Sequence, residues 1–244
     1  MVKWTWKCSE PGCKAHGKKP LPHSKARFHG KLHMKNKHNN RKLEPIIEKI
    51  DIITFYKKAK KIIIEKGYQK EIEIVENRKY EDITPSKFFD EYLFVVLNSG
   101  MKNQIAEKIY KKYWEIAQGF KTQQLLNGLS AIKHEGKHAA IERAIHNCIE
   151  WYDSLDMCKT DTDKISYLET LPWIGQITKY HLARNLGIDC AKPDRHLQRV
   201  AKYFGYTDVQ QMCKELSNFI GERIGTIDIV LWRYCNIFPR LLED

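Results

Sequence analysis

Long apolar runs and a dense cysteine framework are both missing from this sequence. No stretch approaches the roughly 20 apolar residues that a membrane-spanning helix needs, so no membrane partner is expected. The seven cysteines are odd in number, and only Cys8 and Cys13 lie close together, which disfavours a disulfide-stapled secreted fold. The first residues are charged and do not resemble a signal peptide, so we expect a protein of the cytoplasm or nucleoid.

Acidic residues are almost absent from the first 42 positions. This segment has twelve Lys and Arg residues against one acid, Glu10, whereas the rest of the chain has 30 bases and 29 acids. The net charge of +12 therefore belongs almost entirely to residues 1–42. Such asymmetry is typical of a nucleic-acid-binding arm, although a disordered and solvated basic tail has the same composition.

Cysteine and histidine follow each other in this basic segment in the order of a zinc-binding module. Cys8-x4-Cys13 precedes His33-x4-His38, and both spacings occur among zinc fingers, although the stretch between them is longer than usual. His29-x3-His33 is an alternative histidine pair, because residues four apart share one face of a helix. The sequence therefore predicts a structural Zn²⁺ in a finger-like module over residues 1–42.

A helix over about residues 25–37 would carry the histidines of this module. Phe28 and Leu32 are the apolar residues that we expect in its small core. Lys31 and Lys35 would then face DNA phosphates. Residues 39–42 are expected to form the linker to the rest of the chain.

The remainder, residues 43–244, is predicted to form one mainly α-helical domain with two lobes. An apolar stripe over 46–56 belongs to this helical part, while the isoleucine-rich segments 62–64 and 72–75 fit either a short hairpin or a helix. Helical spacing is found over 87–97, 104–116, 121–129, 139–153, 195–204, 209–220 and 228–238.

A short apolar turn between two helical segments is the most informative motif. Its residues are Leu171-Pro172-Trp173-Ile174-Gly175, with helical patterns on both sides. The first amides of the helix that follows have no helical partners and can hold a phosphate. Asp194 comes nineteen residues after Gly175, directly after Pro193 and at the start of another helix.

This segment resembles the helix-hairpin-helix DNA glycosylase superfamily, closely over residues 166–205 and more loosely over about 80–240. The resemblance implies an enzyme that flips a damaged or modified base out of double-stranded DNA and hydrolyses its N-glycosidic bond. It also implies that Asp194 is the catalytic carboxylate, a residue that without the hairpin would be interpreted as a helix cap. Expected DNA contacts at the hairpin are Pro172, Trp173, Ile174, Gly175, Gln176, Ile177, Lys179 and Lys192.

Two further groups of residues follow from the same resemblance. The loop after the first core helix would enter the space left by the flipped base, here with Asn98, Ser99 and Met101, although the usual glutamine-rich form is absent. Aromatic side chains would stack on the extruded base, or else belong to the core. The candidates for this base pocket are Trp173, Tyr180, Trp232 and Tyr152.

The sequence departs from the superfamily at the position where strand-nicking members have a lysine. Ile177 occupies that position and cannot form a Schiff base, so the resemblance implies a monofunctional glycosylase. A bifunctional alternative would use Lys179 or Lys192 as a non-standard nucleophile. No iron–sulfur cluster is expected, because Cys213 and Cys235 stand alone.

Two alternative functions are also compatible with the sequence. The first is a non-catalytic DNA-binding protein that uses the same hairpin and would tolerate loss of the Asp194 carboxylate. The second is a zinc protease, because residues 134–138 match H-E-x-x-H, but Gly136 weakens that helix and no third ligand follows at a suitable spacing. We expect a monomer.

Overall fold

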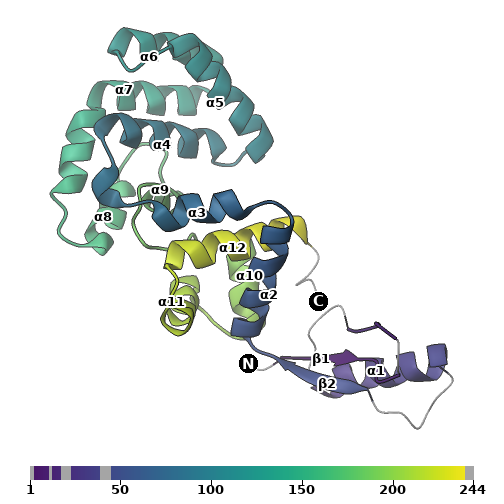
Figure 1. Ribbon diagram of the computed structural model, residues 1–244. Helices are drawn as coiled ribbons and strands as arrows, with labels where there is room; N and C mark the ends of the chain where they lie inside the picture. Colours follow the sequence, from purple (N-terminus) through teal and green to yellow (C-terminus); the bar gives the residue numbers. More distant parts are fainter. Residues whose placement is uncertain (1–2, 11–12, 18–22, 39–44, 240–244) are drawn as a thin grey trace. The chain divides into compact units, whose positions relative to one another are not determined.

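A computed structural model describes residues 3–10, 13–17, 23–38 and 45–239 of the chain (Figure 1). The predicted linker at 39–42 lies outside these residues. The chain divides into two compact units, one of residues 1–72 and 194–244 and the other of residues 73–193. None of the helices in the described part of the chain has the length and apolar character that crossing a membrane requires.

The predicted mainly α-helical fold class is confirmed. The first unit contains the strands β1 (Lys3–Lys7) and β2 (Ile46–Ile50) and the helices α1 (His23–His38), α2 (Ile52–Glu65), α10 (Arg195–Phe204), α11 (Val209–Ile220) and α12 (Ile224–Ile237). The second contains α4 (Pro85–Asn98), α5 (Asn103–Ala117), α6 (Thr122–Gly128), α7 (Glu135–Asp156), α8 (Asp161–Leu168) and α9 (Thr178–Asn185), with short 3-10 helices at Tyr80–Asp82 and Leu129–Ala131. Helix α3 (Gln69–Asn77) contains residues of both units.

The N-terminal elements form a small module of β1, α1 and β2. The two strands are antiparallel, with Trp6 opposite Ile47. The prediction that the apolar stripe is helical from residue 46 was wrong, because residues 46–50 pair with β1 and helix α2 starts only at Ile52. β-branched isoleucines favour a strand where a partner strand is available. The pairing thus joins residues on both sides of the predicted division at residue 42.

The core of this module differs from the predicted one. Phe28 and Leu32 are exposed, at 63% and 41%, rather than buried. The buried face of α1 instead carries the small or flexible residues Ala26, Gly30 and Met34. A Cβ added at Gly30 would lie 2.5 Å from that of Pro45, so the helix approaches this close only because residue 30 is glycine.

The remaining helices of the first unit pack around α12, which contacts α2, α10 and α11. Phe55 on α2 contacts the rings of Phe204 on α10 and Tyr234 on α12, at centroid distances of 5.2 and 5.5 Å. Phe55, Ala59 and Ile63 are buried at a spacing of four residues. This helical spacing explains why segment 62–64 is part of α2, and segment 72–75 is likewise helical, in α3.

The second unit is built around α4, which is buried along most of its length. It contacts α5, α7 and α9, and Figure 1 shows α4, α5 and α7 running alongside one another. Thr84 caps its first turn and Pro85 occupies the first helical position, both favourable residues at a helix start. The buried Glu91 is neutralised by Arg78 at 2.9 Å, so the centre of this unit contains a paired charge.

Candidate functional site

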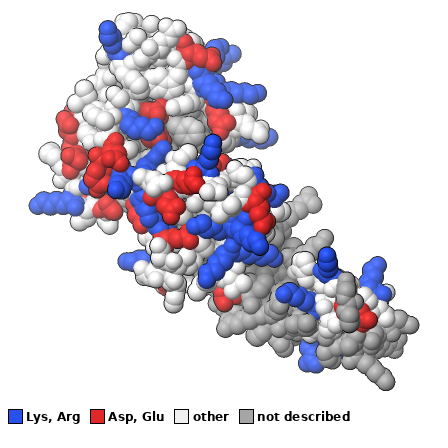
Figure 2. Space-filling view, in the orientation of Figure 1, with Lys and Arg blue, Asp and Glu red and all other residues white. Residues whose placement is uncertain are grey.

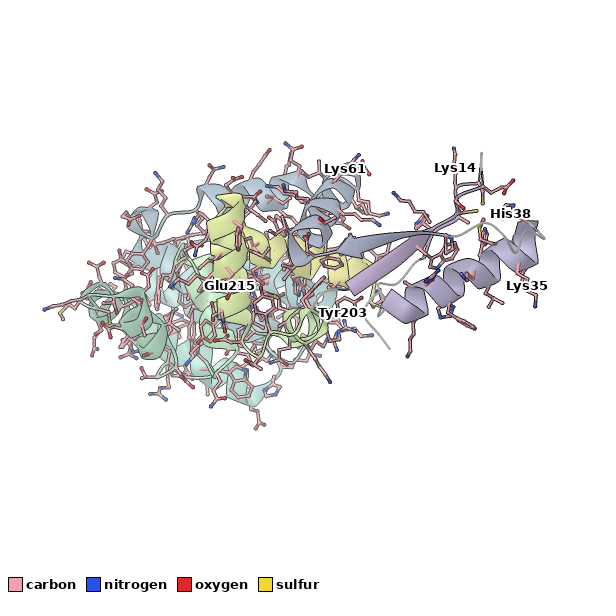
Figure 3. All side chains as sticks on the ribbon, turned by 90° about the horizontal axis from the view of Figure 1, so that it is seen from below. Lys14, Lys35, His38, Lys61, Tyr203 and Glu215 are labelled. Carbon is pink, nitrogen blue, oxygen red and sulfur yellow. The ribbon has the colours of Figure 1, made fainter. Side chains whose placement is uncertain are left out.

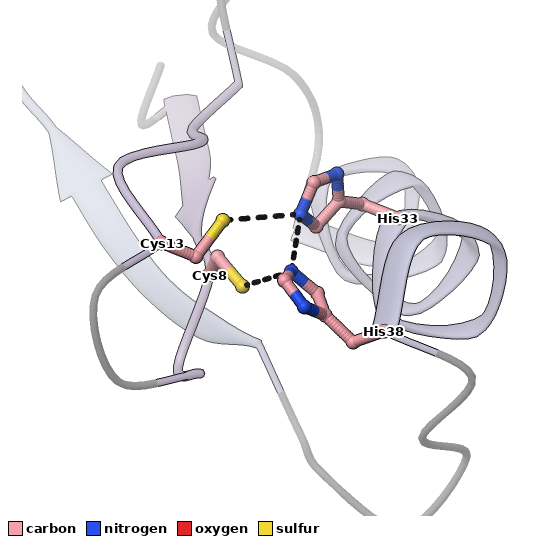
Figure 4. Close-up of side chains that lie close together, drawn as sticks. All are labelled: Cys8, Cys13, His33 and His38. Carbon is pink, nitrogen blue, oxygen red and sulfur yellow. Dashed lines mark hydrogen bonds between the residues drawn. The ribbon is translucent and has the colours of Figure 1, made fainter.

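The four predicted metal ligands converge in the N-terminal module (Figure 4). Cys8 follows β1 and Cys13 lies just beyond it, while His33 and His38 come from the last turns of α1. Their donor atoms all lie within 4.8 Å of one another. His29, the alternative ligand, is exposed and does not belong to this group. The four side chains could therefore hold one metal ion.

The distances within this cluster fit tetrahedral coordination. The Nε2 atoms of His33 and His38 are 3.2 Å apart, and Sγ–Nε2 distances are 3.4 Å for Cys8 with His38 and 3.6 Å for Cys13 with His33. A zinc ion with ordinary bond lengths, about 2.0–2.1 Å to nitrogen and about 2.3 Å to sulfur, would set such edges at roughly 3.3 and 3.6 Å. Since the protein supplies all four donors, such a site would be closed and structural.

Burial favours the uncharged forms of Cys8 and His33. It raises the pKa of the Cys8 thiol, and, together with His38, it lowers the pKa of His33. A neutral imidazole is the form that binds a metal, whereas the thiol has to lose its proton on binding. The donor set and its spacing therefore suit a divalent ion that prefers nitrogen and sulfur.

Several exposed Lys and Arg side chains project from the described surface of this module (Figure 2). Lys31 and Lys35 are exposed on α1, and Figure 3 shows Lys35 on the side of α1 that faces away from the strands. Phe28 and Leu32 are exposed on the same helix. This helix therefore presents apolar and basic side chains together and contains no acidic residue.

In the second unit, the predicted hairpin turn, residues 171–175, lies between α8 and α9. Leu171 and Ile174 are buried, and the Tyr92 hydroxyl on α4 donates a hydrogen bond to the Pro172 carbonyl at 2.6 Å. Gly175 faces open space, because a Cβ built there would meet nothing within 4 Å. The turn is thus anchored on its apolar side and leaves its backbone accessible to a ligand.

Unpaired amides follow this turn. The Gly175 amide donates to Thr178 Oγ1 at 2.8 Å and is already satisfied. The amides of Gln176, Ile177 and Thr178 make no hydrogen bond within the described part of the chain. Amides at the start of a helix carry partial positive charge, so these three donors are suited to a phosphate oxygen.

Both predicted lysines of this region have partners in the same unit. Lys179 Nζ forms an ion pair with Glu169. Lys192 Nζ lies 3.4 Å from Nδ1 of His181, and burial lowers the pKa of this histidine well below its usual value. The imidazole is therefore neutral and can accept a hydrogen bond from Lys192.

The structure brings the α4–α5 loop, residues 99–102, to the hairpin turn. Trp173 Nε1 donates to Ser99 Oγ at 2.7 Å, although the two residues are 74 positions apart. Asn98 donates to Asn103 at 2.9 Å, and Met101 is partly buried against the core of the unit. Of the three predicted loop residues, Ser99 forms a hydrogen bond with the hairpin turn.

The H-E-x-x-H motif lies at the start of α7. His134 is the N-cap residue, and its Nδ1 accepts a hydrogen bond from the Lys137 amide at 3.4 Å. Among the described residues, the cysteine–histidine cluster is the one group suited to a metal, and neither His134 nor His138 belongs to it. The motif therefore serves as a helix start.

In the first unit, Asp194 is the N-cap residue of α10. Its Oδ1 accepts from the amides of His196 at 2.8 Å and Leu197 at 3.2 Å. Its Oδ2 accepts no hydrogen bond from the described residues. The sequence left helix capping and catalysis as alternative roles for Asp194. The two roles are compatible, because Oδ1 caps the helix while Oδ2 is available to a ligand.

The predicted aromatic residues divide between the two units. Trp232 belongs to the first unit, where its ring meets His196 edge-on at 6.4 Å and Arg233 stacks on it at 4.7 Å. Tyr180 and Tyr152 belong to the second, and the Tyr152 hydroxyl donates to the Ile83 carbonyl at 2.7 Å. This contact supports the fold of the second unit. Within the first unit, Trp232 lies against His196, whose amide donates to Asp194.

A basic stripe on α10 was not predicted. Arg195, Arg199 and Lys202 lie four and three residues apart on α10. Together with Gln198 and Pro239 they line a shallow hollow. Arg199 is oriented by bonds of 2.9 Å to the Pro239 carbonyl and to Nδ1 of His196. The helical spacing of these basic residues, in a helix without acidic residues, was the sequence signal that could have identified the stripe.

No known protein family matches this sequence, and no curated protein matches it significantly. Its fold, however, is similar to solved structures. The Methanocaldococcus jannaschii 8-oxoguanine glycosylase/lyase in complex with a 15mer DNA containing 8-oxoguanine has a TM-score of 0.58 and 18% identity, over 79% of this chain and 99% of that chain. The 8-oxoguanine DNA glycosylase of Thermotoga maritima has a TM-score of 0.56 and 19% identity, over 73% and 94%. These likenesses show the fold.

Proposed function

We propose that this protein is a DNA glycosylase that hydrolyses the N-glycosidic bond of a damaged or modified base in double-stranded DNA. The observation that carries the proposal is the state of Asp194, whose Oδ1 caps α10 while Oδ2 accepts no hydrogen bond from the described residues. Two further features support it, namely the phosphate-binding amides after the hairpin turn and a fold similar to that of two 8-oxoguanine DNA glycosylases.

DNA binding relies on backbone amides and on basic side chains of the protein. The free amides of Gln176, Ile177 and Thr178 bind phosphate oxygens without reading sequence. Arg195 and Lys202 on α10, together with the basic face of α1, add electrostatic attraction to the DNA backbone. A base inside a duplex cannot be reached, so the target nucleotide is extruded before the reaction.

Bond cleavage depends on the Asp194 carboxylate. As the glycosidic bond breaks, positive charge builds up on the sugar, and an ionised carboxylate stabilises this charge. Its Oδ2 also accepts a proton from the water that attacks the sugar. The two amide hydrogen bonds to Oδ1 fix the orientation of the carboxylate.

The proposed enzyme is monofunctional. Ile177 has no nucleophilic atom, and the Lys179 amine is engaged by Glu169. Strand cleavage through a Schiff base would require Lys192 or release of Lys179 from this pair. The excised base therefore leaves an intact strand with an abasic site.

The proposed metal is Zn²⁺, bound by Cys8, Cys13, His33 and His38. It would supply folding energy to a module with a very small core and would take no part in bond cleavage. The module then acts as a basic DNA-binding arm.

A panel of duplexes, each with one damaged or modified base, tests this function. The panel includes 8-oxoguanine, the base in the names of the structural neighbours. It also includes an alkylated purine, whose cationic ring an aromatic base pocket would favour through cation–π attraction. We expect strand breaks on one or more lesions only after alkaline treatment. Tight DNA binding without cleavage of any duplex would assign the protein to the non-catalytic DNA-binding class.

A further inference from the structure

Trp173 occupies an unusual backbone position in the hairpin turn. Its φ is +65°, in the left-handed region that glycine usually occupies. A bulky residue in this region is strained and persists only where its surroundings hold it. The contacts of its side chain therefore indicate what compensates for the strain.

The indole of Trp173 contacts two other segments of the second unit. Its Nε1 donates to Ser99 Oγ at 2.7 Å, and its ring meets that of His134 edge-on at 5.1 Å. A Cβ at Gly136 would lie 2.3 Å from Cζ3 of Trp173, so the glycine leaves space that the indole fills. This contact explains a glycine in the first turn of α7, where it weakens the helix.

Ser99 is held from the opposite side by the protein interior. Its hydroxyl donates to the Val96 carbonyl at 2.8 Å, which leaves a lone pair of the oxygen free for the Trp173 indole. The buried Lys137 amine donates to the carbonyls of Leu97 and Ser99, each at 2.7 Å. Both hydrogen bonds secure the end of α4, where the α4–α5 loop begins.

We propose that Trp173 is a positioning residue that joins the α4–α5 loop to the hairpin turn, so that both segments move as one body. This proposal rests on the proposed function, in which the hairpin binds the DNA backbone and the loop enters the duplex. Tyr92, which donates to Pro172, ties the same turn to α4 and completes the connection. Binding of phosphate at the hairpin then holds the loop in place for base extrusion.

The first test needs no DNA. Hydrogen exchange of the amides in residues 99–102 is compared among the wild type, Trp173→Phe, Ser99→Ala and the double variant. Each single variant removes one partner of the hydrogen bond, so we expect about five- to tenfold faster exchange in the loop. The double variant should exchange no faster than the single ones, because all three lack the same bond. Unchanged exchange, or additive effects, would overturn the proposal.

The second test separates positioning from binding. DNA affinity is measured by fluorescence anisotropy, and base extrusion by 2-aminopurine fluorescence at the target position. We expect Trp173→Phe and Ser99→Ala to reduce base extrusion about five- to tenfold more than they reduce DNA affinity. Equal losses in affinity and extrusion would contradict the proposal. A wild type that binds DNA without extruding any base would instead contradict the proposed function, and the exchange experiment would still decide the role of Trp173.

Matched variants control for general effects of the substitutions. Ser130→Ala removes a hydroxyl whose hydrogen bond, to the Asn127 carbonyl, is local. Trp114→Phe makes the same indole-to-phenyl change on α5. We expect both to leave loop exchange and base extrusion unchanged, and similar effects from these controls would overturn the proposal.

Discussion

Lys137 offers a quantitative test of how the end of α4 is held. The substitution Lys137→Met keeps most of the apolar stem but removes two hydrogen bonds of 2.7 Å, to the carbonyls of Leu97 and Ser99. Each buried acceptor left without a partner costs about 1–3 kcal/mol, and relief from burying an amine offsets part of this. We therefore expect the free energy of unfolding to fall by about 2–4 kcal/mol, measured by urea denaturation.

The stability difference between Lys137→Met and the wild type should depend on pH. Burial lowers the pKa of Lys137 in the folded state below its ordinary value of 10.5, which applies to the unfolded state. At a pH between these two pKa values, the unfolded state therefore binds more protons than the folded state. Stability from this group then rises with pH, and the deficit of Lys137→Met relative to the wild type should grow as the pH approaches 10.5. Lys133→Met, at an exposed position, should change stability by less than about 0.5 kcal/mol. A Lys137→Met variant as stable as the wild type would refute this reasoning.

Three further predictions concern the metal, the DNA contacts and the missing nucleophile. Cys13→Ser should abolish stoichiometric zinc in the purified protein, whereas His29→Ala should retain it; zinc loss in His29→Ala would show that the ligand set is wrong. Arg195→Gln and Lys202→Gln should each reduce the slope of log affinity against log salt by about one, whereas Lys214→Gln on α11 should not; equal slopes would exclude α10 from the interface. Ile177→Lys should produce strand breaks without alkali, trapped by borohydride as a covalent complex; breaks that still need alkali would show that this position lies outside the reach of the sugar.

The helical part of the fold follows from the spacing of apolar residues in the sequence. The bounds of α10 and α11 agree with the predicted 195–204 and 209–220, because a capping aspartate precedes each helix and a glycine follows it. The secondary structure of the isoleucine-rich segments was harder to predict, since β-branched residues occur in both strands and helices. Residues 46–50 form a strand only because β1, about 40 positions earlier in the sequence, pairs with them.

The parts of the candidate site that sequence patterns missed depend on long-range contacts. Phe28 and Leu32 were expected in the core of the N-terminal module, but both are exposed. Because His33 and His38 point toward the cysteines, the face of α1 that is buried carries Ala26, Gly30 and Met34 instead. The bond between Trp173 and Ser99 joins positions 74 residues apart, and no local pattern predicts it. The cysteine–histidine cluster, in contrast, was predictable, because metal ligands have characteristic spacings.

The most direct test of the proposed function is the activity of Asp194→Asn. Asparagine caps a helix about as well as aspartate, so this variant keeps the structural role of residue 194 and removes its charge. Asp208→Asn makes the same change at the cap of α11 and serves as the matched control. Single-turnover excision is measured on the lesion that the wild type cleaves. We predict at least a 100-fold loss for Asp194→Asn, a size typical of removing one transition-state interaction, and no loss for Asp208→Asn. Full activity of a folded Asp194→Asn protein would contradict the assignment of Asp194 as the catalytic carboxylate.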